Sequence, residues 1–397
     1  MKTITLFVSL CIFSSSTLAY NDLSDTGLFD HFSDHNNHNN HNHQKPTFFR
    51  GWPHRDRQHE NVSAKSHWAR FRPLFARYSP QYPLWSDGTI KRRWIYLPGG
   101  SKIDTTDSDA WIFPVGTKLW KEFSVREGRK LRKLETRLLE KVEEDQWNME
   151  TYIWNERQTR ATLAPDEGIK NAYPLGNGKF YDIPSKHDCE FCHSKAALDN
   201  GPKVTPVLGF SALQLSDDRD ENAIHGEPLN GRMLTLSVLQ NLGKTSTILD
   251  EMPAIPESDL APLQRQVFGY LHGNCAHCHN ESGLAEFTNT TNFFHSVKAK
   301  FVQQSGTYQT ALGKPITNYL RPNGSPEYII KPGNAAESAL IYRMTEEYEE
   351  YTFDVPPWHH SAGFSLTVGV KMPFVGTNVI DWEAVDIITD YINHLPN

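Results

Sequence analysis

Apolar and polar positions alternate along a series of short runs between residues 67 and 175. In TKLWKEFSV, Leu119, Phe123 and Val125 are separated by polar side chains, which is the spacing of a strand with one buried face. The neighbouring runs KRRWIYLP, LRKLETRLLEKV and METYIWNERQTRATL are together rich in β-branched and aromatic residues and are divided by Pro, Gly and Asp. This pattern predicts an antiparallel, β-rich domain over residues 67–175.

A helical period replaces the alternation near the C-terminus. SDLAPLQRQVFGYLHGN repeats apolar residues at helical spacing and leads directly to Cys275, and NAAESALIYRMTEE reads as a further helix. The last run, DWEAVDIITDYINHL, places six apolar residues on one helical face: Trp382, Val385, Ile388, Tyr391, Ile392 and Leu395. Residues 256–397 are therefore predicted to form a mainly α-helical domain, which makes the chain a multidomain α+β protein. Residues 176–255 lie between the two domains, and no helical pattern leads into Cys189.

The first 66 residues show neither the alternation of a strand nor the apolar spacing of a helix. Residues 1–19, MKTITLFVSLCIFSSSTLA, combine one Lys, an apolar stretch and small residues suited to cleavage, which predicts a signal peptide and an exported protein. Residues 20–66 include an Asn/His run that cannot bury enough apolar area to fold, and they are predicted to be a disordered linker. The alternative is transition-metal capture by the histidines of this run, which are His31, His35, His38, His41 and His43.

Composition narrows the classes of partner. The formal net charge is −7 and no long basic run is present, so the sequence does not predict a nucleic-acid partner. Ten Trp residues in a chain of 397 supply aromatic side chains for sizeable cores. No transmembrane segment is expected in the mature chain, and the oligomeric state stays open. A protein or a small molecule is the expected partner.

Four of the five cysteines fall in two C-x-x-C-H runs, DCEFCH and NCAHCHN. The fifth, Cys11, lies in the predicted signal peptide, so the exported chain keeps no other cysteine for structural disulfides. The residues of the two runs are Cys189, Cys192 and His193 in the first, and Cys275, Cys278 and His279 in the second.

Three kinds of site compete for these runs. A zinc site would join both cysteine pairs across an intervening sequence far longer than in zinc ribbons, and it would not explain a His after each pair. A thioredoxin-like dithiol would expect one C-x-x-C in a βαβ setting. Haem accounts for every residue, because two thiols form thioethers with the porphyrin and the adjacent His becomes the proximal iron ligand. The sequence thus predicts two covalently bound haem c groups. Bacteria attach such haems after export, so a periplasmic, extracellular or cell-surface location is expected.

Distal iron ligands are sought among Met and His. In VGVKMPFVGT, Pro373 biases Met372 away from helical geometry, and glycines flank the run. Met372 is therefore expected to ligate the second iron, whereas Met344, in a helical run, is expected to be an ordinary packing side chain. For the first haem the alternatives stay open: His225, Met233, Met252 or an open sixth position.

The segment from Leu260 to the C-terminus resembles class I cytochrome c domains. The resemblance rests on the helix before CAHCH, the run IIKPGNAAESALIYRM, the Met372-Pro373 loop and the terminal helix. With PLWSDGTIKRRWIYLPGGSKI, FPVGTKLWKEF, IPSKHDCEFCH and YLHGNCAHCH, residues 70–397 are similar to a largely uncharacterised family of exported di-haem c-type proteins. This resemblance implies a β-rich domain ahead of two haem sites, haem attachment at both C-x-x-C-H runs and axial ligation by Met372. It implies no particular reaction.

The expected function is single-electron transfer by an exported di-haem cytochrome to or from a redox partner protein. One alternative is a di-haem enzyme of the peroxidase or oxidase type, whose first haem keeps an open distal face. Another is a β domain that recognises a partner or ligand to which the haems deliver electrons. Charged strand residues could line such a face, although solvated strand faces account for charges more often; they are Lys91, Arg92, Arg93, Glu135 and Arg137.

Overall fold

The computed structural model describes residues 20–30, 47–48, 71–193, 206–258, 262–281, 291–316, 326–346, 350–354, 365–369, 371–373 and 376–397. The predicted signal peptide, residues 1–19, and the five histidines of the Asn/His run lie outside the described residues. None of the described helices is both long and apolar enough to cross a membrane.

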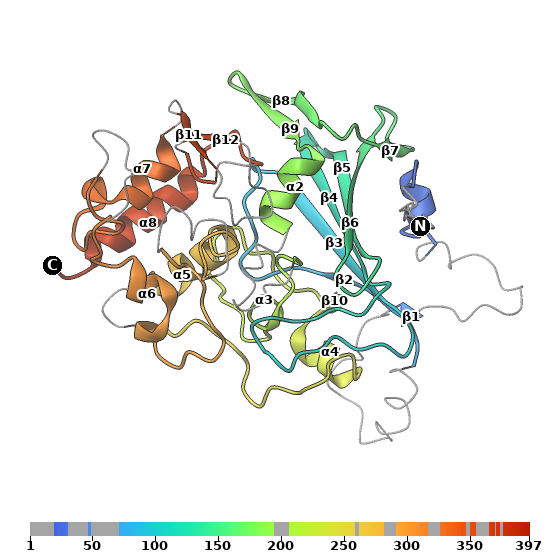
Figure 1. Ribbon diagram of the computed structural model, residues 1–397, viewed down its shortest axis with the longest axis horizontal. Helices are drawn as coiled ribbons and strands as arrows, with labels where there is room; N and C mark the ends of the chain where they lie inside the picture. Colours follow the sequence, from blue (N-terminus) through green and yellow to red (C-terminus); the bar gives the residue numbers. More distant parts are fainter. Residues whose placement is uncertain are drawn as a thin grey trace, which may run out of the picture.

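A mixed sheet dominates the N-terminal half of the molecule (Figure 1). Its strands run in the order β1 to β7, each pair from β2 onward is antiparallel, and β1 and β10 both pair in parallel with β2. The strands are β1 (Thr47–Phe48), β2 (Leu74–Tyr78), β3 (Ile90–Leu97), β4 (Lys118–Glu127), β5 (Lys130–Lys141), β6 (Trp147–Trp154), β7 (Ala161–Leu163) and β10 (Met233–Leu234). The predicted β-rich character is confirmed, and the two short parallel strands come from outside residues 67–175.

Both faces of this sheet are covered, which explains why the apolar alternation along the strands is only approximate. One face buries Ile95 and Leu119, and the other buries Trp94 and Trp120. Successive strand residues point to opposite faces, so a strand covered on both sides needs apolar residues at consecutive positions. A separate hairpin, β8 (Ile169–Gly176) with β9 (Lys179–Ile183), leads from the sheet to the first C-x-x-C-H run.

Residues 20–30 pack against the sheet, contrary to their assignment to the disordered linker. They form the 3-10 helix η1 (Leu23–Thr26), whose N-cap Asp22 accepts a hydrogen bond from the Ser24 amide and pairs with Arg160. Leu23 and Leu28 are buried in the aromatic layer around Trp120. The prediction was wrong here because this stretch carries apolar side chains that the Asn/His run after it lacks.

The middle segment covers the opposite face of the sheet. Phe210, Leu215, Leu236 and Leu239 pack there with Ile95. Their elements are α3 (Ala212–Leu215), β10 and α4 (Leu236–Asn241), preceded by α2 (Lys186–His193). The segment predicted to hold the first haem site is therefore packed on the β-rich part rather than separate from it.

Helices dominate the C-terminal part (Figure 1). They are α5 (Gln264–Asn274), α6 (Gly306–Thr310), α7 (Ala339–Thr345) and α8 (Trp382–His394), with the short η3 (Val302–Gln304) and η4 (Ala335–Glu337) and the hairpin β11 (Glu350–Asp354) with β12 (Ser365–Gly369). Helix α8 packs on α5 and α7. Five of the six residues predicted on its apolar face are buried, but Trp382 is 58% exposed, because it is the first residue after the N-cap Asp381 and lies at the rim of the core. Met344 packs in this core, as a packing side chain would.

Candidate functional site: two adjacent C-x-x-C-H runs

Helix α2 carries the first run. Ser185 and Asp188 cap its N-terminus reciprocally: the Asp188 carboxylate accepts from the Ser185 amide and hydroxyl, and the Ser185 hydroxyl accepts from the Asp188 amide. The run is helical, so Cys189 and Cys192 lie on one face of α2, three residues apart. Burial raises the pKa of the Cys189 thiol to about 11, which keeps it protonated at neutral pH.

The imidazole of His193 is oriented by the chain that follows it. Its Nδ1 lies 2.6 Å from the backbone oxygen of Pro206. A carbonyl oxygen only accepts hydrogen bonds, so Nδ1 carries the proton and Nε2 is left with its lone pair. A His held in this way is in the tautomer that binds a metal through Nε2. Burial also lowers the pKa of His193, which favours the neutral ring.

The second run continues from the C-terminus of α5. The Cys275 amide donates to the Leu271 oxygen, and the amides of Cys278 and His279 both donate to the Cys275 oxygen. This turn directs the His279 ring inward against Phe293, with 5.4 Å between ring centroids. Burial, with smaller effects of the charges of His277 and Arg343, lowers the pKa of His279 to about 4. A hydrogen bond with the Thr291 backbone raises this pKa and only partly offsets the shift, so the imidazole is neutral at neutral pH, as a metal ligand must be.

The fold brings the two runs together from α2 and the end of α5. The Sγ atoms of Cys192 and Cys278 and a ring nitrogen of His277 all lie within 4.8 Å of one another. The hydrogen bond between the two thiols lowers the pKa of Cys192 and raises that of Cys278. Within the described part of the chain this cluster holds three donors, whereas a structural zinc site is closed by four. Cys189 and Cys275 lie outside the cluster, so the four cysteines do not form the tetrahedron that the zinc alternative requires.

Met372 lies beside α7. Its backbone amide donates to the Arg343 oxygen at 2.6 Å, and its peptide bond to Pro373 is cis. Arg343 is also one of the charges that act on the His279 ring. The loop that carries Met372 is therefore tied to α7 through the backbone of Arg343.

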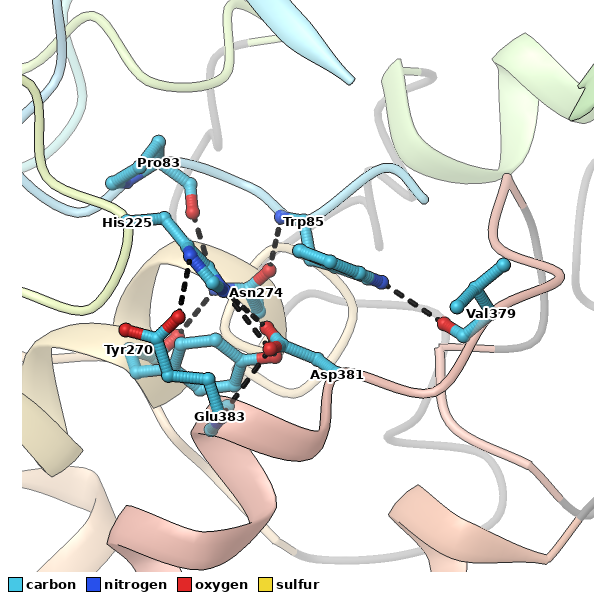
Figure 2. A network of polar contacts seen from close by, with 9 residues as sticks. Pro83, Trp85, His225, Tyr270, Asn274, Val379, Asp381 and Glu383 are labelled. Carbon is cyan, nitrogen blue, oxygen red and sulfur yellow. Dashed lines mark hydrogen bonds and ion pairs between the residues drawn. The ribbon is translucent and has the colours of Figure 1, made fainter. Parts of the chain in front are cut away.

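His225 is engaged elsewhere (Figure 2). Its Nε2 lies 2.8 and 2.9 Å from the two carboxylate oxygens of Asp381, and its Nδ1 lies 3.6 Å from Glu383. Tyr270 donates to the same Asp381 carboxylate at 2.9 Å, and the Trp85 ring stacks on the imidazole with 4.8 Å between centroids. Through the hydrogen bonds of its Nε2 with Asp381, His225 joins the middle segment to the N-terminus of α8.

The two Met candidates for the first haem are packing residues in this arrangement. Met233 is 4% exposed in β10, paired with Arg77 of β2. Met252 packs against the apolar cluster that contains Leu236 and Leu239. The distal ligand of the first site therefore stays unassigned.

Two histidines near the second run, the half-buried His272 and the buried His295, were not predicted. His272 lies in α5, three residues before Cys275, and its Nδ1 accepts a hydrogen bond from the His295 amide at 3.1 Å. Burial lowers the pKa of His272 to about 3 and that of His295 to about 4. The position of His272, close to the run on the same helix, was a signal available in the sequence. His295 carried none, since only the fold brings it to α5.

No family model, no curated protein and no solved structure matches this chain. The candidate site therefore rests on its own geometry and chemistry. Paired thiols on a helical turn, a His193 ring held for coordination through Nε2 and a buried neutral His279 ring fit the attachment of haem at both runs.

Proposed function

We propose that this chain is an exported c-type cytochrome that binds two haems and transfers single electrons to or from a redox partner protein. The observation that carries the proposal is the junction of the two C-x-x-C-H runs at Cys192 and Cys278, combined with the His193 Nδ1 contact to the Pro206 oxygen. Two redox groups attached at one junction are suited to pass electrons from one to the other. Two metal sites with unrelated roles would have no need to lie together.

The residues have separate roles in this proposal. Cys189 and Cys192 hold one haem, and Cys275 and Cys278 hold the other; each thiol adds across a vinyl double bond, with the sulfur bonding one carbon and the hydrogen passing to the other. His193 and His279 would each bind one haem iron, and Met372 would be a second protein ligand of the iron that His279 holds. Bound haem iron supplies one-electron redox chemistry. The chain half-buries both imidazoles and, through the Pro206 carbonyl, fixes one of them.

The C-terminal part from α5 to α8 is proposed to be a class I cytochrome c-like unit. Its helix α5 delivers Cys275, the Met372 loop follows α7, and α8 packs across α5. The β-rich part and the middle segment would then present the first haem against this unit.

The first test is haem quantitation on the full exported chain, produced in a bacterial host that matures c-type haems. We expect two haems per chain, and one haem per chain in each double variant, Cys189→Ala with Cys192→Ala and Cys275→Ala with Cys278→Ala. His279→Ala should abolish or alter one low-spin spectrum. A wild-type chain that carries no covalent haem, with the metal content of a zinc protein, would refute the proposal.

Carbon monoxide binding to the reduced chain separates the electron carrier from the enzyme alternative. A carrier with both irons six-coordinate should leave its optical spectrum unchanged on addition of the gas. Ready binding at one haem would indicate an open distal face and would replace electron transfer with peroxidase or oxidase chemistry.

A further inference from the structure

A row of three cations crosses the sheet face that lies toward the first C-x-x-C-H run. Arg93 of β3 pairs with Lys121 of β4, and Lys121 pairs with Arg137 of β5. Residues paired across strands project from the same face with their Cβ atoms roughly 5 Å apart, and like charges placed so are destabilising. In the adjacent row Lys91 pairs with Phe123, which is paired with Glu135. Four cations and one carboxylate therefore share this part of the face.

These groups are withdrawn from bulk water. Arg93 is 5% exposed and Glu135 is fully buried, while Lys91 and Lys121 are half-buried. Burial, together with neighbouring positive charge, lowers the pKa of Lys91 to about 7 and that of Lys121 well below its usual range. A cation cluster that is poorly solvated is stabilised most by an anion placed against it.

The nearby carboxylates already have other partners. Glu135 binds the Arg137 guanidinium and accepts from the Tyr181 hydroxyl. Asp87 accepts from the amides of Asn378 and Val379.

The remaining two acids are also engaged, Asp381 with His225 and Tyr270, and Glu227 with Arg77. Across the described ranges, no carboxylate lies within ion-pair distance of Lys91, Arg93 or Lys121. The protein thus places these three basic groups together without a carboxylate of their own, with only the Phe123 ring lying under the Lys121 ammonium, at 4.9 Å.

The cation row lies next to α2. Helix α2 contacts β6 of the same sheet. Electrostatic effects reach across this contact: Arg137 acts on Cys189, and both Lys121 and Arg137 act on His193. The first run therefore lies within electrostatic reach of Lys121 and Arg137.

We propose that Lys91, Arg93 and Lys121 form a carboxylate-binding site that takes the propionate groups of the haem attached at Cys189 and Cys192. The inference rests on the proposed function. Guanidinium and ammonium groups are the usual partners of carboxylates, and a tethered haem holds two carboxylates permanently beside the row. A free small carboxylic acid shares this chemistry and is the alternative source of the anion.

The test uses the haem-loaded full chain with Lys121→Gln, alone and combined with Lys91→Gln. Removal of the cations should lower the midpoint potential of one haem, because the ferric state gains stability when nearby positive charge is lost, and should lower the potential of the other haem less. The propionate bending mode in the resonance Raman spectrum should shift in the same variants. Lys121→Arg should restore both readouts.

Arg92→Gln is the matched control. Arg92 lies between Lys91 and Arg93 on β3 but points to the opposite face, where it pairs with Glu122 at 3.7 Å. This variant should keep both potentials and the Raman mode of the wild type. If the double lysine variant also keeps both potentials and the Raman mode at full haem content, propionate binding by Lys91, Arg93 and Lys121 is refuted.

Two further outcomes are informative. One distinguishes a free carboxylate from the haem propionates, and the other distinguishes failure of this inference from failure of the proposed function. Citrate could instead raise the thermal stability of the haem-loaded wild type in a saturable way, and this effect could be lost in the double lysine variant while the Raman mode stays unchanged. That result would assign the site to a free carboxylate and overturn the propionate assignment. Failure of the proposed function looks different, since the wild-type chain would then carry no haem at all.

Discussion

At the scale of single residues, hydrogen-bond partners decide which candidate can act as a ligand. His193 donates from Nδ1 to a carbonyl and keeps Nε2 free, whereas His225 faces carboxylates with both nitrogens. The sequence already separates them, since His193 follows a cysteine pair and His225 does not; the positions of Pro206 and Asp381 decide the hydrogen-bond partners of the two rings.

Met372 gives a prediction at this scale. His/Met ligation raises the reduction potential of a haem, so Met372→Ala should lower one of the two midpoint potentials in an optical redox titration. Met344→Ala is the control, because Met344 is buried in the helical core. It should lower the free energy of unfolding by about 2–5 kcal/mol and leave both potentials in place. Unchanged potentials in Met372→Ala would make Met372 a packing residue.

His295 gives a pH dependence of stability. Burial lowers the pKa of His295 to about 4 from its ordinary value of 6.5, so between these values the unfolded chain binds a proton that the folded chain does not. The contribution of the neutral His295 ring to the free energy of unfolding is therefore complete above about pH 6.5. It is lost as the pH falls toward about 4, at about 1.4 kcal/mol per pH unit.

The free energy of unfolding can be measured in urea at about pH 7 and about pH 5. Replacing His295 with Leu should reduce the difference between the two values. His394→Leu, at an exposed position near the end of α8, should keep the wild-type slope. Equal slopes in all three proteins would mean that His295 does not contribute.

At the scale of elements, α5 connects the C-terminal helices to the β-rich part through two glycines. An added Cβ at Gly269 would lie 2.0 Å from a ring carbon of Tyr82, and one at Gly273 would lie 2.4 Å from the Tyr82 oxygen. The helix can therefore lie directly on the chain that enters β3, which sets the position of Cys275 relative to the sheet.

Gly269→Ala should destabilise the protein by roughly 1–3 kcal/mol or more, because the buried Tyr82 ring has no room to move. Gly231→Ala is the matched control, since nothing lies within 4 Å of its added Cβ, and it should unfold at the wild-type denaturant concentration. Chemical denaturation measures the free energy of unfolding of both variants. A stable Gly269→Ala protein would contradict the close packing of α5 on Tyr82.

At the scale of the whole molecule, the junction of the two runs is the central feature. It predicts that the haem-free chain, oxidised with diamide, forms a disulfide between Cys192 and Cys278, because their Sγ atoms lie within 4.8 Å. Peptide mapping by mass spectrometry without reduction should detect the crosslinked peptides, and Cys278→Ala should abolish them. If disulfides form only within each run, the two runs do not lie together.

Much of this arrangement was accessible from the sequence. Strands β3 to β6 and helices α5 and α8 coincide with runs of clear period, because each buries a regular set of side chains, and the two C-x-x-C-H runs are local motifs. Residues 20–30 and the pairing of β10 with β2 were missed. Their order comes from contacts with distant residues such as Trp120 and Tyr78, which leave no local pattern.

The sequence by itself determined the residues of the two runs, the β-rich character of the chain and the cations of β3 to β5, since each depends on chemistry within a few consecutive positions. Only the tertiary structure decided that the two runs meet, that His225 belongs to Asp381, and that Arg93, Lys121 and Arg137 form one row beside α2. Strand register and helix docking set these distances, and both depend on contacts between residues far apart in the chain.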